Sequence, residues 1–134
     1  MMSNKKPTVY TTVFWLIQEH KIEPEALFDF QELFWPSFIE IDNYVFLKEN
    51  FSEEKYKKCN QQETDPEYWI NLLTIDEYFS ELSDWREKSI SFAKSLVSIW
   101  NAKLKQEFPK KKFSVQFVHS DDVGDYGLTF FSVI

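Results

Sequence analysis

The strongest hydrophobic pattern in the chain lies between residues 84 and 108. Asp84 and Glu87 have the spacing of a capping box, which satisfies the first free N–H groups of a helix. Pro109 disfavours helical geometry in the residue before it, so we expect a helix of about six turns that ends by Phe108. Apolar residues recur within it at steps of three and four, as on one buried helix face. They are Phe92, Ala93, Leu96, Val97, Trp100 and Leu104.

Two stretches with an apolar alternation follow this helix. Residues 113–119 alternate between apolar and polar side chains, which predicts a strand with one buried face. Residues 121–127 supply Asp and Gly for a turn, and residues 128–134 predict the returning strand. The second strand has apolar residues on both faces, so we expect it to be central in the sheet or covered on both sides.

The clearest β pattern in the N-terminal half surrounds Asp42 and Asn43. These two residues tolerate the left-handed geometry of a tight turn, and residues 38–41 and 44–47 flank them as short apolar strands. A single strand from Ile39 to Leu47 is the competing interpretation, because its apolar residues also share one strand face. We favour the hairpin.

Shorter helices are expected between these elements. Residues 7–22 fit a helix that ends near His20, although their Thr and Val content also suits a strand. Capping and proline signals mark the starts of four further short helical segments. They are Pro24, Ser52, Asp65 with Pro66, and Thr74 with Glu77.

Together these patterns predict a single α+β domain over residues 1–134. We expect an antiparallel sheet of about four strands, formed by the two hairpins, with the long helix on one face and short helices around it. The 134 residues are enough to bury a core without disulfides or metal. With 14 Phe, 6 Tyr and 5 Trp, the chain also holds more aromatic surface than such a core hides, so some aromatic side chains should line a groove or interface.

The composition excludes several kinds of site. Two glycines cannot form a Gly-rich phosphate loop, a dinucleotide fingerprint or a Gly-x-Ser-x-Gly elbow, and two His with one Cys leave no structural zinc set. We therefore expect no cofactor and no metal. Cys59 lies in a polar run with no evident apolar or helical context and is expected to be a spectator thiol. One Cys and no long apolar segment predict a cytoplasmic protein without a membrane span.

Charge is unevenly distributed around a net value of −7. Acidic side chains dominate residues 19–54 and 63–87, whereas lysines dominate residues 88–112. Basic residues among aromatic ones can bind nucleic acid. Here the basic strip is short, the chain is acidic, and lysines at a helix C-terminus already complement the helix dipole, so we do not expect nucleic acid as the partner.

The first candidate site is the acidic and aromatic N-terminal half. Aromatic anchors surrounded by carboxylates suit a surface that docks on a basic protein, and the charges would speed association. In the alternative interpretation the aromatic residues form the core and the carboxylates a solvated face. The aromatic residues are Phe28, Phe34, Trp35, Tyr44 and Phe46, and the carboxylates are Glu23, Glu25, Asp29, Glu32, Glu40 and Asp42. We take Glu23, Glu25, Asp29 and Trp35 as the candidate binding residues.

The second candidate site lies at the end of the strand 113–119. His119 shares its apolar face and is followed by Asp121, Asp122 and Asp125. A carboxylate beside a His can orient and charge the imidazole for general base work, so we take His119 and Asp122 as candidates. The alternative is a plain Asp- and Gly-containing turn, which also lacks the ligand spacing of an EF-hand.

Two functions follow from these sites. The leading hypothesis is a small acidic cytoplasmic interaction or inhibitor protein, comparable to an immunity protein, that binds a basic protein without catalysis. The alternative is a small enzyme or ligand-binding domain that uses His119 and nearby carboxylates in an aromatic-lined pocket. An exposed aromatic surface ringed by acids would favour the first hypothesis, and a deep cavity reaching His119 would favour the second.

Overall fold

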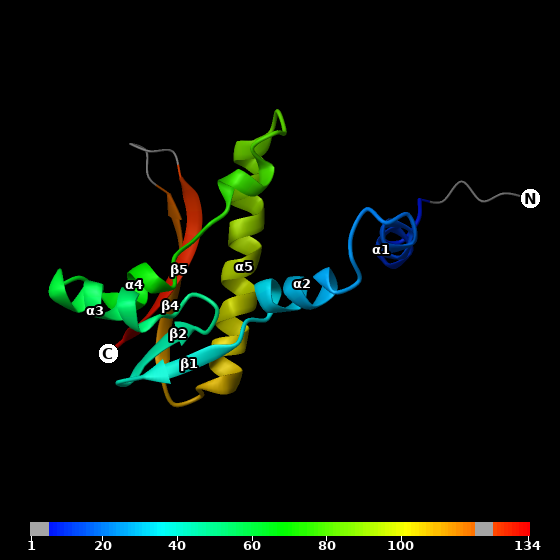
Figure 1. The fold of residues 1–134 in the computed structure, drawn as a ribbon. Coiled ribbons are helices and arrows are strands. Elements are labelled where there is room, and N and C mark those ends of the chain that lie inside the picture. Colours follow the sequence, from blue (N-terminus) through cyan, green and yellow to red (C-terminus); the bar gives the residue numbers. More distant parts are fainter. Residues whose placement is uncertain (1–5, 120–124) are drawn as a thin grey trace, which may run out of the picture. The chain divides into compact units, whose positions relative to one another are not determined.

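The computed structural model describes residues 6–119 and 125–134, and its fold is α+β, as predicted. The chain forms two compact units, Met1–Leu33 and Phe34–Ile134. The first unit is described from residue 6 and is helical. The second contains both sheets and the long helix (Figure 1).

The first unit consists of α1 (Val9–Gln18) and most of α2 (Ala26–Phe34). Thr8 begins α1, because its Oγ1 accepts a hydrogen bond of 3.2 Å from the Thr11 N–H. His20 has a φ of 58°, the left-handed conformation that commonly follows a helix. The helical interpretation of this segment is therefore confirmed, and the strand interpretation is wrong.

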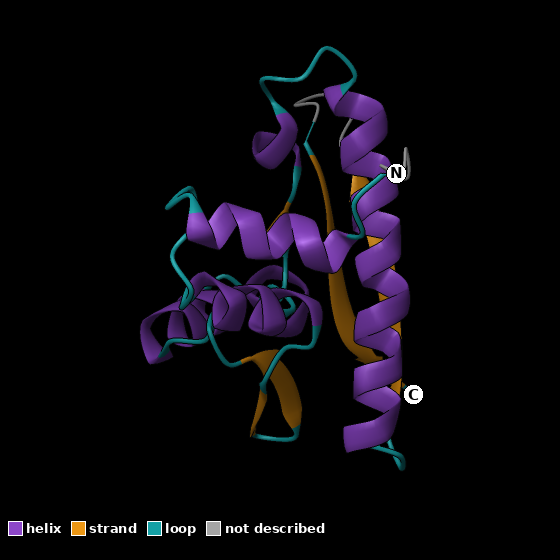
Figure 2. Cartoon of the chain, turned by 90° about the vertical axis from the view of Figure 1, so that its right-hand side faces the viewer, coloured by secondary structure: helices purple, strands orange, loops and turns teal. Residues whose placement is uncertain are grey.

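The long helix α5 (Trp85–Glu107) runs beside β4 (Lys112–His119) and β5 (Tyr126–Val133) in the second unit (Figures 1 and 2). Its predicted face is buried, with Ala93, Leu96, Trp100 and Leu104 inside the core. The Trp100 ring meets Phe130 of β5 edge-on, at a centroid distance of 6.2 Å. The predicted C-terminal end of α5 is confirmed, because the helix ends at Glu107.

The start of α5 differs in detail from the prediction. Asp84 precedes the helix, but its side chain makes no capping hydrogen bond. Its carboxylate instead lies 3.9 Å from the Lys88 ammonium, one turn along the helix. The capping-box interpretation is therefore wrong here, although the boundary is correct.

β5 is the central strand of a three-stranded antiparallel sheet in the order β3-β5-β4. The central position was expected from its apolar residues on both faces. β3 (Leu73–Thr74) was not predicted and pairs with Leu128 and Gly127. A Cβ on Gly127 would lie 2.2 Å from the Leu73 carbonyl oxygen, so the close approach of β3 requires glycine there.

The segment after β3 forms the 3-10 helix η1 (Asp76–Phe79), where a helical turn was expected. Thr74 belongs to β3 and does not cap it. Ile75 occupies the N-cap position, with no side-chain hydrogen bond. The backbone N–H of Ile75 instead donates to the Tyr126 carbonyl oxygen at 2.7 Å, which continues the pairing with β5.

The N-terminal hairpin is confirmed as β1 (Phe38–Ile41) and β2 (Tyr44–Leu47). Asp42 and Asn43 have φ values of 52° and 71°, as a two-residue turn of this kind requires. The hairpin, however, forms its own two-stranded sheet. The prediction of one sheet of about four strands is therefore wrong, and the structure has separate sheets of two and three strands.

Side chains of α4 (Pro66–Ile70) and of the residue that follows it bond the outer edge of β2, which keeps the two sheets separate. Glu67 Oε2 accepts a hydrogen bond of 2.9 Å from the Val45 N–H. Asn71 Oδ1 accepts one of 2.8 Å from the Leu47 N–H, and Asn71 Nδ2 donates to the Val45 carbonyl oxygen at 3.0 Å. These bonds satisfy main-chain groups that a neighbouring strand would otherwise pair.

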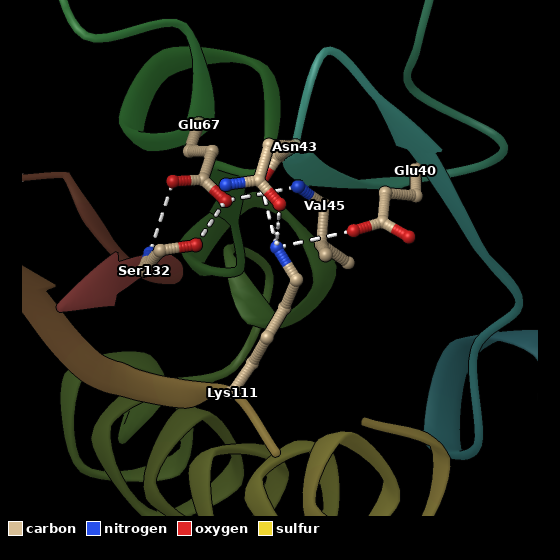
Figure 3. Close-up of polar contacts among 6 residues, drawn as sticks. All are labelled: Glu40, Asn43, Val45, Glu67, Lys111 and Ser132. Atoms are coloured by element: carbon tan, nitrogen blue, oxygen red, sulfur yellow. Dashed lines mark hydrogen bonds and ion pairs between the residues drawn. The ribbon is translucent and has the colours of Figure 1, made fainter. Parts of the chain in front are cut away.

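The same two side chains reach β5, and Figure 3 shows the contact of Glu67 with Ser132. Glu67 accepts hydrogen bonds from the Ser132 N–H at 2.9 Å and from the Ser132 hydroxyl at 2.8 Å. Asn71 Nδ2 also donates to the Phe130 carbonyl oxygen at 3.2 Å. Both residues are buried, so this bridge lies inside the second unit.

The predicted starts of α3 (Glu53–Gln61) and α4 are confirmed. Ser52 Oγ accepts a hydrogen bond of 3.1 Å from the Lys55 N–H, and Asp65 Oδ1 accepts one of 3.0 Å from the Glu67 N–H. Pro66 occupies the first turn of α4, where its missing N–H costs nothing. The Asp65 cap thus fixes the helix turn that carries Glu67.

Candidate functional site

The predicted carboxylates of the first unit lie around the start of α2. The Glu23 and Glu25 carbonyl oxygens accept hydrogen bonds from Ala26 and Phe28, and Asp29 stands in the first helical turn. Negative charge is favourable at this end of a helix. All three side chains are exposed, and none forms an ion pair within residues 6–119 and 125–134.

Exposed aromatic side chains accompany these carboxylates within the first unit. Neither α1 nor α2 contains a buried residue. Four rings of the unit are between 51 and 82% exposed, and α1 carries no charged residue. The rings are those of Tyr10, Phe14, Trp15 and Phe28. We refer to these four residues, with Glu23, Glu25 and Asp29, as the first-unit surface.

The prediction missed the three aromatic residues of α1. The residues whose spacing fits one face of this helix are Val9, Val13, Leu16, Ile17 and His20. Tyr10, Phe14 and Trp15 lie off that face, and Tyr10 and Phe14 are one turn apart on the same side of the helix. The sequence did contain a signal for this exposed cluster, because its aromatic residues lie outside the apolar face of a helix that has no charged residue.

Trp35 lies in the second unit, whereas the three carboxylates belong to the first. Its ring is 42% exposed, and the Lys103 ammonium lies 5.9 Å from its centroid. The same ammonium lies 5.0 Å from the Phe38 centroid and forms an ion pair of 2.6 Å with Glu107. Trp35 therefore takes part in packing around Lys103 as well as facing solvent.

Phe46, which was also a candidate for the surface, belongs to the core of the second unit, whereas Phe34 and Tyr44 are partly exposed. Phe46 is fully buried and packs against Phe51 and Tyr56, with Cys59 and Ile70 in the same cluster. For Phe46, the core interpretation is the correct one. Cys59 has the helical and apolar surroundings that the sequence did not reveal, because it projects from α3 into this cluster.

His119 lies at the end of β4 and takes part in a stack of rings. Its imidazole is nearly parallel to the rings of Tyr126 and Phe117, at centroid distances of 5.5 and 6.1 Å. It lines a cavity of about 280 Å³ together with Asp125 and Trp69. Asp121 and Asp122 lie outside the described residues, so the role proposed for Asp122 stays a prediction.

Lysines of the basic strip have structural partners. The Lys111 ammonium donates to the carbonyl oxygen and to Oδ1 of Asn43 at 2.8 and 2.7 Å, and forms an ion pair of 3.1 Å with Glu40 (Figure 3). It therefore holds the turn of the β1–β2 hairpin. Lys103 is likewise paired with Glu107.

Within the described ranges, no three His, Cys, Asp or Glu side chains gather in a way that could hold a metal ion. Among those same residues, no helix combines the length and the apolar character that crossing a membrane requires.

One family model matches residues 15–133 of the chain, and its description is the uncharacterized protein PM0498 family. The chain belongs to this family. No curated protein and no solved structure matches it.

In this PM0498-family protein, the matched region contains the candidate residues predicted from the sequence, from Glu23 to Asp122. It begins at Trp15, within α1. Tyr10 and Phe14 therefore lie before the matched region, whereas the carboxylates of the first-unit surface lie inside it.

Proposed function

We propose that this chain is a small acidic cytoplasmic protein of the interaction or inhibitor type, which binds a basic protein through the first-unit surface and catalyses no reaction. One observation carries the proposal. Two consecutive helices contain no buried residue and expose aromatic side chains, and the carboxylates at the start of the second form no ion pair in the described chain.

The energetics of α1 support a binding role. A helix of 10 residues is marginal in water by itself, and most helices gain their stability from an apolar face packed on other elements. The exposed rings of Tyr10, Phe14 and Trp15 lack such packing. Exposed aromatic clusters of this kind are typical of interfaces, where Tyr and Trp supply much of the binding free energy.

The charges of the first-unit surface support a basic protein as the partner. Glu23, Glu25 and Asp29 add to a net charge of −7, so a basic surface would be attracted before contact is made. An acidic inhibitor of a basic nuclease or toxin would use this arrangement. The aromatic rings would supply the buried centre of the interface and the carboxylates its polar rim.

The test is a capture experiment from the native host with matched bait variants. The surface variant carries Glu23→Lys, Glu25→Lys and Asp29→Lys. The control variant carries Glu49→Lys, Glu77→Lys and Glu81→Lys, which change the charge equally at exposed positions of the second unit. We expect wild-type and control baits to retain one basic protein that the surface variant loses.

Binding kinetics with that protein then distinguish the electrostatic attraction by the carboxylates from the apolar contacts of the aromatic rings. The association rate should fall as salt shortens the Debye length below about 8 Å. A second variant, Tyr10→Ser with Phe14→Ser, should mainly raise the dissociation rate. Retention of the same partner by the surface variant, or capture of an acidic protein, would contradict the proposal.

The ring stack at His119 favours a second candidate function, a ligand-binding or catalytic domain. The imidazole packs nearly parallel to the rings of Phe117 and Tyr126, beside a cavity that Asp125 also lines. This function predicts a small molecule that binds the wild-type chain and not the His119→Ala variant, with both proteins equally stable. Equal binding to both proteins would contradict it.

A further inference from the structure

A second cavity lies in the second unit between α3 and α4. Its volume is about 440 Å³, which falls in the range of small-molecule sites in proteins. It involves no residue of the first-unit surface and does not reach His119. Trp69 and Leu72 line both this cavity and the one beside His119, whereas Lys55, Lys58, Cys59 and Ile70 line this cavity alone.

The inner wall of this cavity is apolar. Ile70 and Cys59 are buried side chains that line it, and Leu72 extends the same wall. Trp69 stands at its side with an indole ring that is 54% exposed, and this ring packs edge-on against Tyr68 at 5.0 Å. A half-exposed indole beside an apolar floor offers a flat surface on which a ring can stack.

The rim of the cavity is positive. Lys55 and Lys58 line it from α3, three residues apart and hence on one side of the helix. The Lys55 ammonium donates to the Asn50 carbonyl oxygen at 3.1 Å, which holds it in place with two further donors to offer. None of the described residues that line the cavity is acidic, although the chain carries a net charge of −7.

The Lys58 ammonium makes no hydrogen bond or ion pair with the residues that the structure describes. An ammonium group at an apolar cavity gains from a carboxylate or sulfonate within hydrogen-bond distance. A neutral apolar ligand would leave both lysines unused, and a cation would be repelled. The cavity thus complements a molecule with an apolar ring and a negative group.

We propose that the α3–α4 cavity binds a small organic anion, with a flat apolar ring against Trp69 and Ile70 and a carboxylate or sulfonate group beside Lys55 and Lys58. This role goes beyond the proposed interaction function, because it needs neither the first unit nor a protein partner. A ligand bound here would also cover Cys59.

The test uses 8-anilinonaphthalene-1-sulfonate, which carries an aromatic ring system and one sulfonate. Lys58→Glu removes the attraction and adds repulsion, so we expect affinity to fall about fivefold or more. Trp69→Ala should also weaken binding, and Trp69→Phe should preserve most of it. The matched control is Lys57→Glu, an exposed lysine of α3 that does not line the cavity and should bind like wild type.

Cys59 supplies an independent readout, because it is the one cysteine of the chain. The rate of its alkylation by iodoacetamide, which is uncharged, can be followed by mass spectrometry with and without the dye. We expect the dye to slow this reaction in the wild-type chain and in Lys57→Glu, and to have little effect in Lys58→Glu. Thermal midpoints establish that each variant is folded, and Lys58→Gln replaces any Lys58→Glu protein that is not.

The proposal is overturned if Lys58→Glu and Lys57→Glu bind the dye alike, or if the dye leaves the alkylation of Cys59 unchanged. The dye could also bind the exposed rings of the first unit. The variant Phe14→Ser with Phe28→Ser tests this directly, and loss of dye binding in that variant would likewise overturn the proposal.

Discussion

Glu67 and Asn71, one helical turn apart, bond the main chains of β2 and β5 with their side chains. Together they accept or donate six hydrogen bonds to Val45, Leu47, Phe130 and Ser132. The two sheets are therefore connected through side chains at a place where a strand ladder would otherwise form. A single substitution in this bridge therefore affects contacts with both sheets.

Replacing Glu67 by Gln should destabilise the protein. Both carboxylate oxygens accept hydrogen bonds, and an amide nitrogen in either position would face an N–H or O–H donor. The expected loss is about 1.5–3 kcal/mol in the free energy of unfolding, measured with urea at pH 7. Glu77→Gln, at an exposed position, is the control. A loss no larger than that of the control would show that the bridge contributes little.

Gly127→Ala should also lower stability. The new Cβ would lie 2.2 Å from the Leu73 carbonyl oxygen, and a backbone atom cannot move aside without displacing β3. We expect a cost of about 1–3 kcal/mol, as for overpacking in a core. Hydrogen exchange at the Ile75 N–H, which bonds the Tyr126 carbonyl oxygen, should become faster. Gln116→Ala on β4 is the control, and unchanged exchange in Gly127→Ala would refute this account of β3.

Ser89→Ala should raise stability. Among the described residues, the Ser89 hydroxyl is a buried side-chain group without a hydrogen-bond partner. Its removal ends the cost of burying an unsatisfied polar group, and Ala is the better helix former. The expected gain is about 1 kcal/mol in urea unfolding. Ser95→Ala provides the contrast, because the Ser95 hydroxyl is exposed and donates to the Ser91 carbonyl oxygen at 3.1 Å. A loss of stability in Ser89→Ala would indicate a partner for its hydroxyl.

Tyr56 should make stability fall at alkaline pH. Burial raises the pKa of its phenol above the ordinary value of 10.0, and the hydrogen bond to Asp42 with the negative charge of that carboxylate raises it further. The folded state thus favours the protonated phenol. Its contribution is complete below pH 10 and is lost as the pH rises through the folded-state pKa.

The test compares urea midpoints from pH 8 to 11 for wild type and Tyr56→Phe. We expect the wild-type protein to lose more stability above pH 10 than the variant does. Absorbance at 295 nm, which follows the ionisation of tyrosine, should show a titration at high pH in the wild-type protein that the Tyr56→Phe variant lacks. Parallel curves for the two proteins would contradict the role of this phenol.

Local patterns were sufficient to predict most of the elements. The apolar stripe of α5 and the left-handed pair Asp42 and Asn43 act over a few residues, so the sequence shows them directly. β3 could not be predicted in the same way, because two residues carry no periodicity. The separation of the sheets depends on contacts between Glu67 and residues 22 or 65 positions away in the chain.

The candidate sites were predictable to a smaller extent. Charge density pointed to Glu23, Glu25 and Asp29, which are exposed in the structure. Aromatic content alone could not separate Phe46, which is buried, from Phe28, which is 69% exposed. That distinction depends on which elements pack together, and so does the positive rim at Lys55 and Lys58 beside an apolar wall.

The bridge formed by Glu67 and Asn71 also bears on how this family can diverge. A main-chain ladder forms with almost any side chains, so paired strands tolerate sequence drift at most positions. A junction made of side chains has no such tolerance, because each of its two residues satisfies main-chain groups on both strands. Relatives should therefore keep both residues or exchange them together, and the surrounding helix can vary around this fixed pair.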